Sequence, residues 1–170
     1  MSDMPFVIDH QMQDQWCWAA VALSICRFFK DQRWQQQCDV VNEIFGPIRG
    51  DTDCCTDGAS STCNMPWALD IVLNTAGHLL QPVRGIVTFD EVKQQVLVQK
   101  RPFAARIMLA DLMTAHFVVV IGCDEAGDGR QWVKVADPGG STGNTNTIEY
   151  SALLNDYMPG ASWDQSYFTC

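Results

Sequence analysis

Cys17 is the first residue of the sequence whose type and setting suit chemistry, because it stands between Trp16 and Trp18 where a glutamine-rich segment gives way to an apolar run. The run from Trp18 to Phe29 contains neither Gly nor Pro, and it predicts a helix buried on most faces. Cys17 would then lie in the first helical turn, where unpaired N–H groups and the helix dipole favour the reactive thiolate. These features predict a nucleophilic cysteine, and a buried structural thiol is the alternative.

Gln11 lies six residues before Cys17 and is the candidate donor to a developing negative charge. Its side-chain amide could donate a hydrogen bond to an oxyanion that forms beside the thiol. Gln13 and Gln15, in the same segment, are alternatives for this role.

A cysteine with an ordinary pKa needs an adjacent base, and the sequence offers three histidines. His10 lies in the segment that must also carry Gln11. His78 follows a glycine after a predicted helix and suits a cap or a surface position. His116 begins an apolar run, 117–122, that is typical of a central strand. Such a strand would fix the backbone of His116 and place its ring at the sheet edge, which favours it as the base.

Asp137 is the candidate group that orients the base, since it ends the predicted strand 132–136 directly before Pro138. If this strand and the one that follows His116 pair antiparallel, joined by the turn 124–130, both side chains emerge at the same end of the sheet. Asp-Pro also commonly begins a turn, so Asp137 can serve a local role as well.

The pattern of the whole chain predicts helices first and strands second, which is an α+β layout. We expect a lead-in with an edge strand at 6–8, a helix at 38–45 halted by Gly46-Pro47, a helix at 65–76 capped by Asn64, and a capping box at Thr88 that opens a helix to about 99. Strands are expected at 104–109, 117–122, 132–136, 144–148 and 163–169, with a short helix at 150–157.

The eight cysteines are many for a reduced compartment. Cys26 and Cys123 fall in apolar elements and are expected to be buried free thiols. The remaining cluster around one polar loop comprises Cys38, Cys54, Cys55 and Cys63, and could form two disulfides. Three pairings are possible, of which a bond between the adjacent Cys54 and Cys55 would be strained. A four-thiolate zinc site is the alternative, although the paired Cys-x2-Cys spacing is missing.

Composition and charge exclude several classes of function. The net charge of −9 and the lack of a Lys/Arg cluster argue against a nucleic-acid surface or a polybasic membrane patch. No segment approaches the roughly 20 apolar residues of a membrane span, and the start of the chain lacks a signal-peptide pattern. We expect a single domain over 1–170, a monomer, with no metal and no cofactor.

The Gln-x5-Cys-Trp arrangement at a helix start resembles the papain-like cysteine peptidases. The form Trp-Cys-Trp-Ala-Ala is most similar to the bacterial branch of avirulence-effector peptidases delivered into plant cells. The resemblance spans about residues 8 to 169 and implies a helical half, about 1–100, packed through the nucleophile helix on an antiparallel sheet half, about 101–170. It implies a catalytic histidine at the start of a strand, as at His116, and an aspartate at Asp137 where papain has asparagine. Proteins of this branch also have a Cys-Cys pair followed by Cys-Asn, which favours disulfides here.

The resemblance implies a cysteine peptidase that acts on protein or peptide substrates, as a secreted or translocated effector. Trp18 and Trp163 are candidates for contact with substrate, although both can instead pack or shield the site. A deamidase or an acyl transferase (transpeptidase- or transglutaminase-like) with the same triad is a second hypothesis, because the triad does not determine what accepts the acyl group. A peptidase that cuts bacteriocin leaders is a related option, although such peptidases carry a different sequence around the cysteine. A disulfide-stabilised binding module or an inactive homologue is the third.

Overall fold

The computed structural model describes residues 2–50, 52–109, 114–139 and 143–170. In chain order its elements are β1 (Ser2–Asp3), α1 (Cys17–Phe28), α2 (Gln37–Arg49), α3 (Leu69–Ala76), α4 (Phe89–Lys93), η1 (Gln94–Val98), β2 (Phe103–Leu109), β3 (Thr114–Glu125), β4 (Gln131–Asp137), β5 (Asn144–Glu149), α5 (Tyr150–Asn155) and β6 (Ala161–Phe168). Apart from the short β1 and from α5, which lies between β5 and β6, the helices come before the strands, and the expected α+β class is confirmed.

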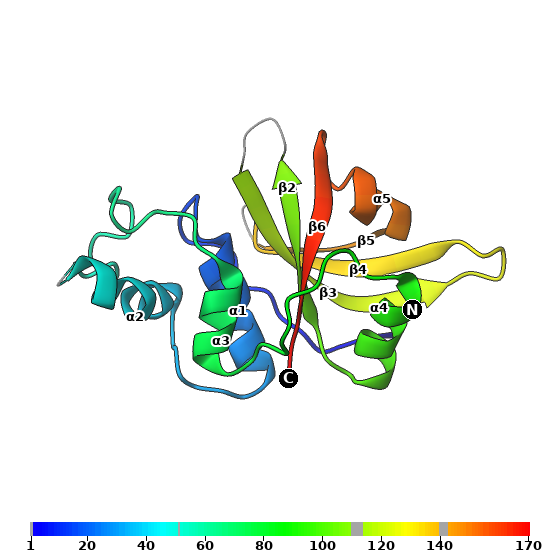
Figure 1. Ribbon diagram of the computed structural model, residues 1–170, viewed down its shortest axis with the longest axis horizontal. Helices are drawn as coiled ribbons and strands as arrows, with labels where there is room; N and C mark the ends of the chain where they lie inside the picture. The colour runs from blue at the N-terminus through cyan, green and yellow to red at the C-terminus, as the bar shows by residue number, and fades with distance from the viewer. Residues whose placement is uncertain (1, 51, 110–113, 140–142) are drawn as a thin grey trace.

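The strands form one antiparallel sheet in the order β5-β4-β3-β2-β6, and β1 adds to β3. The central strand β3 is buried from Phe117 to Cys123, as its unbroken apolar run predicts. In Figure 1 the helices α1, α2 and α3 lie on one side of the molecule, while α4 and α5 accompany the sheet.

Helix α1 is the element shared by both halves of the molecule. Its residues from Cys17 to Cys26 are all buried, because it packs against α2 and α3 on one side and against β3 on the other. A helix surrounded in this way needs apolar residues on every face, which explains why its sequence lacks an amphipathic stripe.

The sheet half begins earlier in the chain than about residue 101. Backbone hydrogen bonds already join Leu80 N to Phe168 O, at 2.8 Å, and Arg84 N to Ser166 O, at 3.0 Å. The capping box at Thr88 is confirmed, with Glu91 as its partner, but the helix that it opens belongs to the sheet side and continues as the π-helical turn η1. The segment from Leu80 onward therefore packs with the sheet half, because it is hydrogen-bonded to β6.

The edge strand expected at 6–8 is wrong, and the helix expected at 38–45 is present but does not stop at Gly46-Pro47. The strand that joins β3 is Ser2–Asp3, and Phe6 instead turns inward to pack on Phe28, with ring centroids 5.9 Å apart. Helix α2 continues through Pro47 to Arg49. Proline removes one hydrogen bond near the end of this helix, and the five buried apolar residues of α2 hold it nevertheless.

Helix α3 begins at Leu69, and Asn64 does not cap it. The side-chain oxygen of Asn64 accepts a hydrogen bond from Gln15 N instead, at 2.9 Å. The predicted cap was wrong because a partner far along the chain takes up the side chain.

The cysteine cluster forms two disulfides, Cys38–Cys55 and Cys54–Cys63. This settles the pairing that the sequence left open and excludes the four-thiolate zinc alternative. Cys26 and Cys123 are free and buried, as expected.

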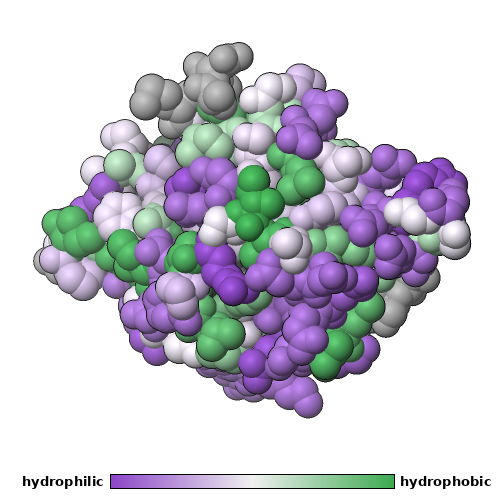
Figure 2. Space-filling view, turned by 45° about the vertical axis from the view of Figure 1, so that its right-hand side comes forward, coloured by the Kyte–Doolittle hydropathy of each residue, from purple (hydrophilic) through white to green (hydrophobic). Residues whose placement is uncertain are grey.

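Polar and apolar side chains are interspersed on the face shown in Figure 2, where apolar patches stand apart from one another. Among the described residues, no helix combines the length and the apolar character that crossing a bilayer requires.

Candidate active site

Cys17 is the first residue of α1, and its side chain is only 6% exposed. The N–H groups in the first turn of a helix have no partner within the helix. Trp16, which precedes α1, cannot accept a hydrogen bond from them, because its side chain is a donor and binds Cys63 O at 2.9 Å. The Cys17 sulfur therefore lies beside a helix N-terminus that has no side-chain cap.

His116 and Asp137 come together through the pairing of β3 with β4, in which Val119 lies opposite Ala136. The Nε2–H group of His116 donates to Asp137 Oδ1 at 2.6 Å. Gly139 N donates to the same oxygen at 2.7 Å, and the Tyr157 hydroxyl donates to Oδ2 at 2.6 Å. The carboxylate is thus held from three sides, and it holds the imidazole in turn.

Electrostatics make this pair ionic at neutral pH. Burial disfavours the imidazolium, but hydrogen bonds with Asp137 and Cys17 outweigh burial and raise the pKa of His116 from 6.5 to about 10. Burial also acts to raise the pKa of Asp137, but the hydrogen bond and charge of His116 lower it below its usual value. An imidazolium next to a thiol is the arrangement that stabilises a thiolate.

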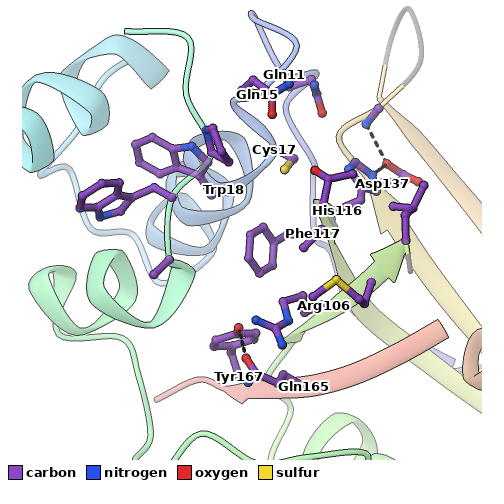
Figure 3. Close-up of a pocket in the computed structure, with 18 of the residues that line it drawn as sticks. Gln11, Gln15, Cys17, Trp18, Arg106, His116, Phe117, Asp137, Gln165 and Tyr167 are labelled. Carbon is purple, nitrogen blue, oxygen red and sulfur yellow. Dashed lines mark hydrogen bonds and ion pairs between the residues drawn. The ribbon is translucent and has the colours of Figure 1, made fainter. Parts of the chain in front are cut away.

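Gln11 lies on the cleft next to Cys17 (Figure 3), with its amide group engaged in its own loop. Its Nε2 group donates to Gln13 O at 3.0 Å and to Asp14 O at 2.9 Å. Its Oε1 atom is buried and has no hydrogen-bond partner in the described part of the chain. Gln15, the alternative donor, also lines the cleft.

The cleft has a volume of about 1090 Å³ and is lined by both halves of the molecule. Trp67 and Ile71 lie on the helical side, and Met108 and Phe117 on the sheet side. Arg106 also lines the cleft, and in Figure 3 it lies between Phe117 and Tyr167. Its guanidinium group binds the Asp164 carboxylate at two points, 2.9 and 2.6 Å.

The structure places the remaining candidates as follows. Trp18 is fully buried and donates to Met65 O at 2.8 Å, with part of its ring lining the cleft. Trp163 is 1% exposed, packs against Phe103 and Tyr150, and is not part of the described cleft lining. The structure therefore does not bring Trp163 to the substrate, because its ring is enclosed by the core on the other side of β6.

The other two histidines have different partners. His10 donates through Nδ1 to Pro138 O at 3.1 Å. His78 pairs with Asp31 at 3.1 Å and stacks on Phe29.

In the part of the chain that the structure describes, two groups of side chains combine residue types that could bind a metal ion, and neither group is part of the cleft lining. One contains Cys38, Asp39 and Cys55, but the two sulfurs are bonded to each other. The other contains Cys26, Asp31 and His78, where the carboxylate and the imidazole are already hydrogen-bonded to each other, at 3.1 Å.

Tyr157 and Arg106 are site residues that sequence reasoning missed. Tyr157 was expected only as the end of a helix, but the helix ends at Asn155 and the tyrosine turns toward Asp137. A polar aromatic residue after a short helix carries no signal of a distant partner. Arg106 interrupts an apolar strand, and that interruption was a usable signal of a functional position.

Comparison with known families supports the chemistry of this site. The model of the papain-like cysteine protease AvrRpt2 family matches residues 1–154. No curated protein matches the chain in sequence.

Proposed function

Since this chain belongs to the papain-like cysteine protease AvrRpt2 family and is thus a cysteine peptidase, we propose that it hydrolyses protein substrates through Cys17, His116 and Asp137. The observation that carries the proposal is the position of His116, whose ring interacts with Cys17 on one side and with Asp137 on the other. The cleft beside these residues is lined by both halves of the molecule, and such a cleft suits an extended peptide.

In the proposed reaction, the Cys17 thiolate attacks the carbonyl carbon of the scissile peptide and forms a carbon–sulfur bond. The electron pair of the carbonyl double bond moves onto the carbonyl oxygen. The backbone N–H of Cys17 and the Nε2 group of Gln11 stabilise this oxyanion. Gln11 keeps its hydrogen bond to Asp14 O and transfers the other from Gln13 O to the substrate.

The tetrahedral intermediate collapses when the His116 imidazolium gives its proton to the departing amine. This leaves an acyl group on the Cys17 sulfur and a neutral imidazole. His116 then takes a proton from water, the water oxygen attacks the thioester, and the thiolate is released. Asp137 keeps the imidazole oriented throughout and stays ionised.

We also propose that the protein works as a translocated effector. Its family comprises effector peptidases, and its two disulfides need an oxidising stage in the life of the chain.

The experiment that tests the function is a comparison of new peptide N-termini in a denatured proteome treated with the wild type, Cys17→Ala or Cys123→Ala. Cys123 is a buried free cysteine far from the cleft lining, and its variant is the matched control. We expect new N-termini with the wild type and with Cys123→Ala only. Identical cleavage by Cys17→Ala, or no cleavage by the wild type, would contradict the proposal.

A further inference from the structure

We propose that Gln37 and Asn64 are positioning residues that hold the loop 10–16 in its catalytic shape, and that the two disulfides hold Gln37 and Asn64 in turn. We call these two amides and the two disulfides the clamp. This proposal rests on the proposed function, because the loop carries the oxyanion donor Gln11 and leads into Cys17.

Gln37 binds the loop on both sides of Gln11. Its Oε1 atom accepts from Met12 N at 2.9 Å, and its Nε2 group donates to His10 O at 2.7 Å. The side chain belongs to a residue only 4% exposed, at the first turn of α2. A primary amide donates through its nitrogen and accepts through its oxygen, so it can bind an N–H and a carbonyl of the same loop at once, and a buried amide is costly without partners.

Asn64 fixes the far end of the same loop. Its Oδ1 atom accepts from Gln15 N at 2.9 Å. The neighbouring Cys63 carbonyl accepts from the indole of Trp16 at 2.9 Å, in a buried position. The loop is therefore held at residues 10, 12, 15 and 16 by two segments that lie well apart in the sequence.

The disulfides connect these two segments covalently. Cys38 follows Gln37 and bonds to Cys55, whereas Cys63 precedes Asn64 and bonds to Cys54. Because Cys54 and Cys55 are adjacent, one short stretch of chain ties both anchors together. Gly58 in the same stretch packs so closely that an added Cβ would lie 3.0 Å from the Trp16 ring.

The loop needs such anchors because, before the buried Trp16, none of its residues 10–15 is buried in the core. One side of it faces the cleft, and the other faces a second hollow of about 660 Å³ that Met12 and Gln13 help to line. Cys17, His116 and Asp137 stand instead on α1, β3 and β4, which the core supports. Loosening the clamp should therefore displace the oxyanion donor Gln11. The contact between Cys17 and His116 should remain.

The test compares Gln37→Met with Gln95→Met. Gln95 is also 4% exposed, and its amide donates to Thr169 O on the sheet side, so it controls for burial and loss of an amide. We expect Gln37→Met to lower kcat/KM on the order of 10- to 100-fold, as misplaced catalytic groups do, while Gln95→Met stays within about threefold. Alkylation of Cys17 by iodoacetamide needs no oxyanion donor, and its rate should stay within about threefold in both.

Asn64 offers a rescue that a merely structural role would not produce. Asn64→Leu removes the acceptor for Gln15 N, whereas Asn64→Asp retains it. We expect Asn64→Asp to recover most of the activity that Asn64→Leu loses. The pair Cys38→Ser with Cys55→Ser should reproduce the pattern of Gln37→Met, and a change in melting temperature alone would refute the role given to the disulfide.

Hydrogen exchange separates failure of this proposal from failure of the proposed function. The amides of residues 10–16 should exchange faster in Gln37→Met than in Gln95→Met, whether or not a substrate is cleaved. Unchanged exchange, or equal losses of turnover and alkylation, would overturn the clamp. If the wild type cleaves no substrate while residues 10–16 still exchange faster in Gln37→Met than in Gln95→Met, only the peptidase proposal is overturned.

Discussion

Replacing Asp137 by asparagine should change the pH dependence of catalysis more than its rate at neutral pH. Asparagine has nearly the same shape, and Gly139 N and His116 Nε2 both donate to the Oδ1 position, at 2.7 and 2.6 Å. These two donors fix the new amide with its oxygen toward the imidazole. The variant therefore keeps the orientation of His116 and loses only the negative charge.

The structure sets the size of the effect. A rise in the pKa of His116 from 6.5 to about 10 corresponds to about 5 kcal/mol in favour of the imidazolium, at about 1.4 kcal/mol per pKa unit. The Cys17 interaction and a neutral hydrogen bond remain in the variant, so we expect about half of this, roughly 2 to 3 kcal/mol, to disappear. The pKa of His116 should then fall below the value of about 10 that it has beside the carboxylate.

The assay is kcat/KM for a fluorogenic peptide between pH 5.5 and 10, in which the alkaline limb reports the imidazolium. The ratio of wild-type to variant activity should grow on the order of tenfold from pH 6.5 to pH 9. Asp31→Asn is the matched control, since it removes the charge of a second His–Asp pair, 3.1 Å long and outside the cleft lining. A ratio that stays constant across this pH range would refute the ionic pair, and His116→Ala should lose far more activity than Asp137→Asn at every pH.

Three further changes test the other parts of the site. Cys17→Ala should abolish turnover and shift the free energy of unfolding by no more than about 1 to 2 kcal/mol in urea denaturation, because it removes one small group; intact turnover would exclude Cys17 as nucleophile. Tyr157→Phe removes a 2.6 Å hydrogen bond to the Asp137 carboxylate, so it should cost about 1.5 to 3 kcal/mol of stability at pH 7 and lower kcat, because the carboxylate that orients His116 loses one of its three donors; an unchanged kcat would mean that Tyr157 does not act through Asp137. Gln11→Ala should lower kcat on the order of 100-fold and Gln15→Ala less than tenfold in steady-state assays; the reverse order would transfer the oxyanion role to Gln15.

The sequence predicted the three groups of the proposed triad because each depends on local signals. Cys17 marks a boundary between polar and apolar chain, and His116 and Asp137 flank a hairpin whose strands are recognisable from their runs. An antiparallel hairpin leaves little freedom in where its two open ends lie. The register of this hairpin therefore predicts that His116 and Asp137 lie next to each other.

The sequence could not predict the groups that act across long separations. Gln37 and Asn64 hold one loop through hydrogen bonds to Met12 and Gln15, which lie 25 and 49 residues away in the sequence. The residues next to Gln37 and Asn64 give no sequence signal of these contacts. Asn64 before an apolar run instead suggested a helix cap, which is a common local use of the same side chain. The disulfide pairing was open for the same reason, because four clustered cysteines allow three pairings and only the fold distinguishes them.

The oxyanion side and the base side of the site meet at one carbonyl group. Pro138 O accepts from Gln11 N at 2.9 Å and from His10 Nδ1 at 3.1 Å, and Pro138 follows Asp137 directly. His10, which sequence analysis weighed as a base, is thus a link between the loop and the sheet. Any movement of the Asp137 turn is passed to Gln11 through this carbonyl. The effects on kcat/KM of substitutions on the two sides should therefore not be additive. In a double-mutant cycle, Gln37→Met should be paired with Asp137→Ala, which frees the turn because it releases Gly139 N and the Tyr157 hydroxyl. The two substitutions should show a coupling energy above about 0.5 kcal/mol in kcat/KM, although their side chains bind different groups. Strict additivity would mean that the clamp and the catalytic pair act independently.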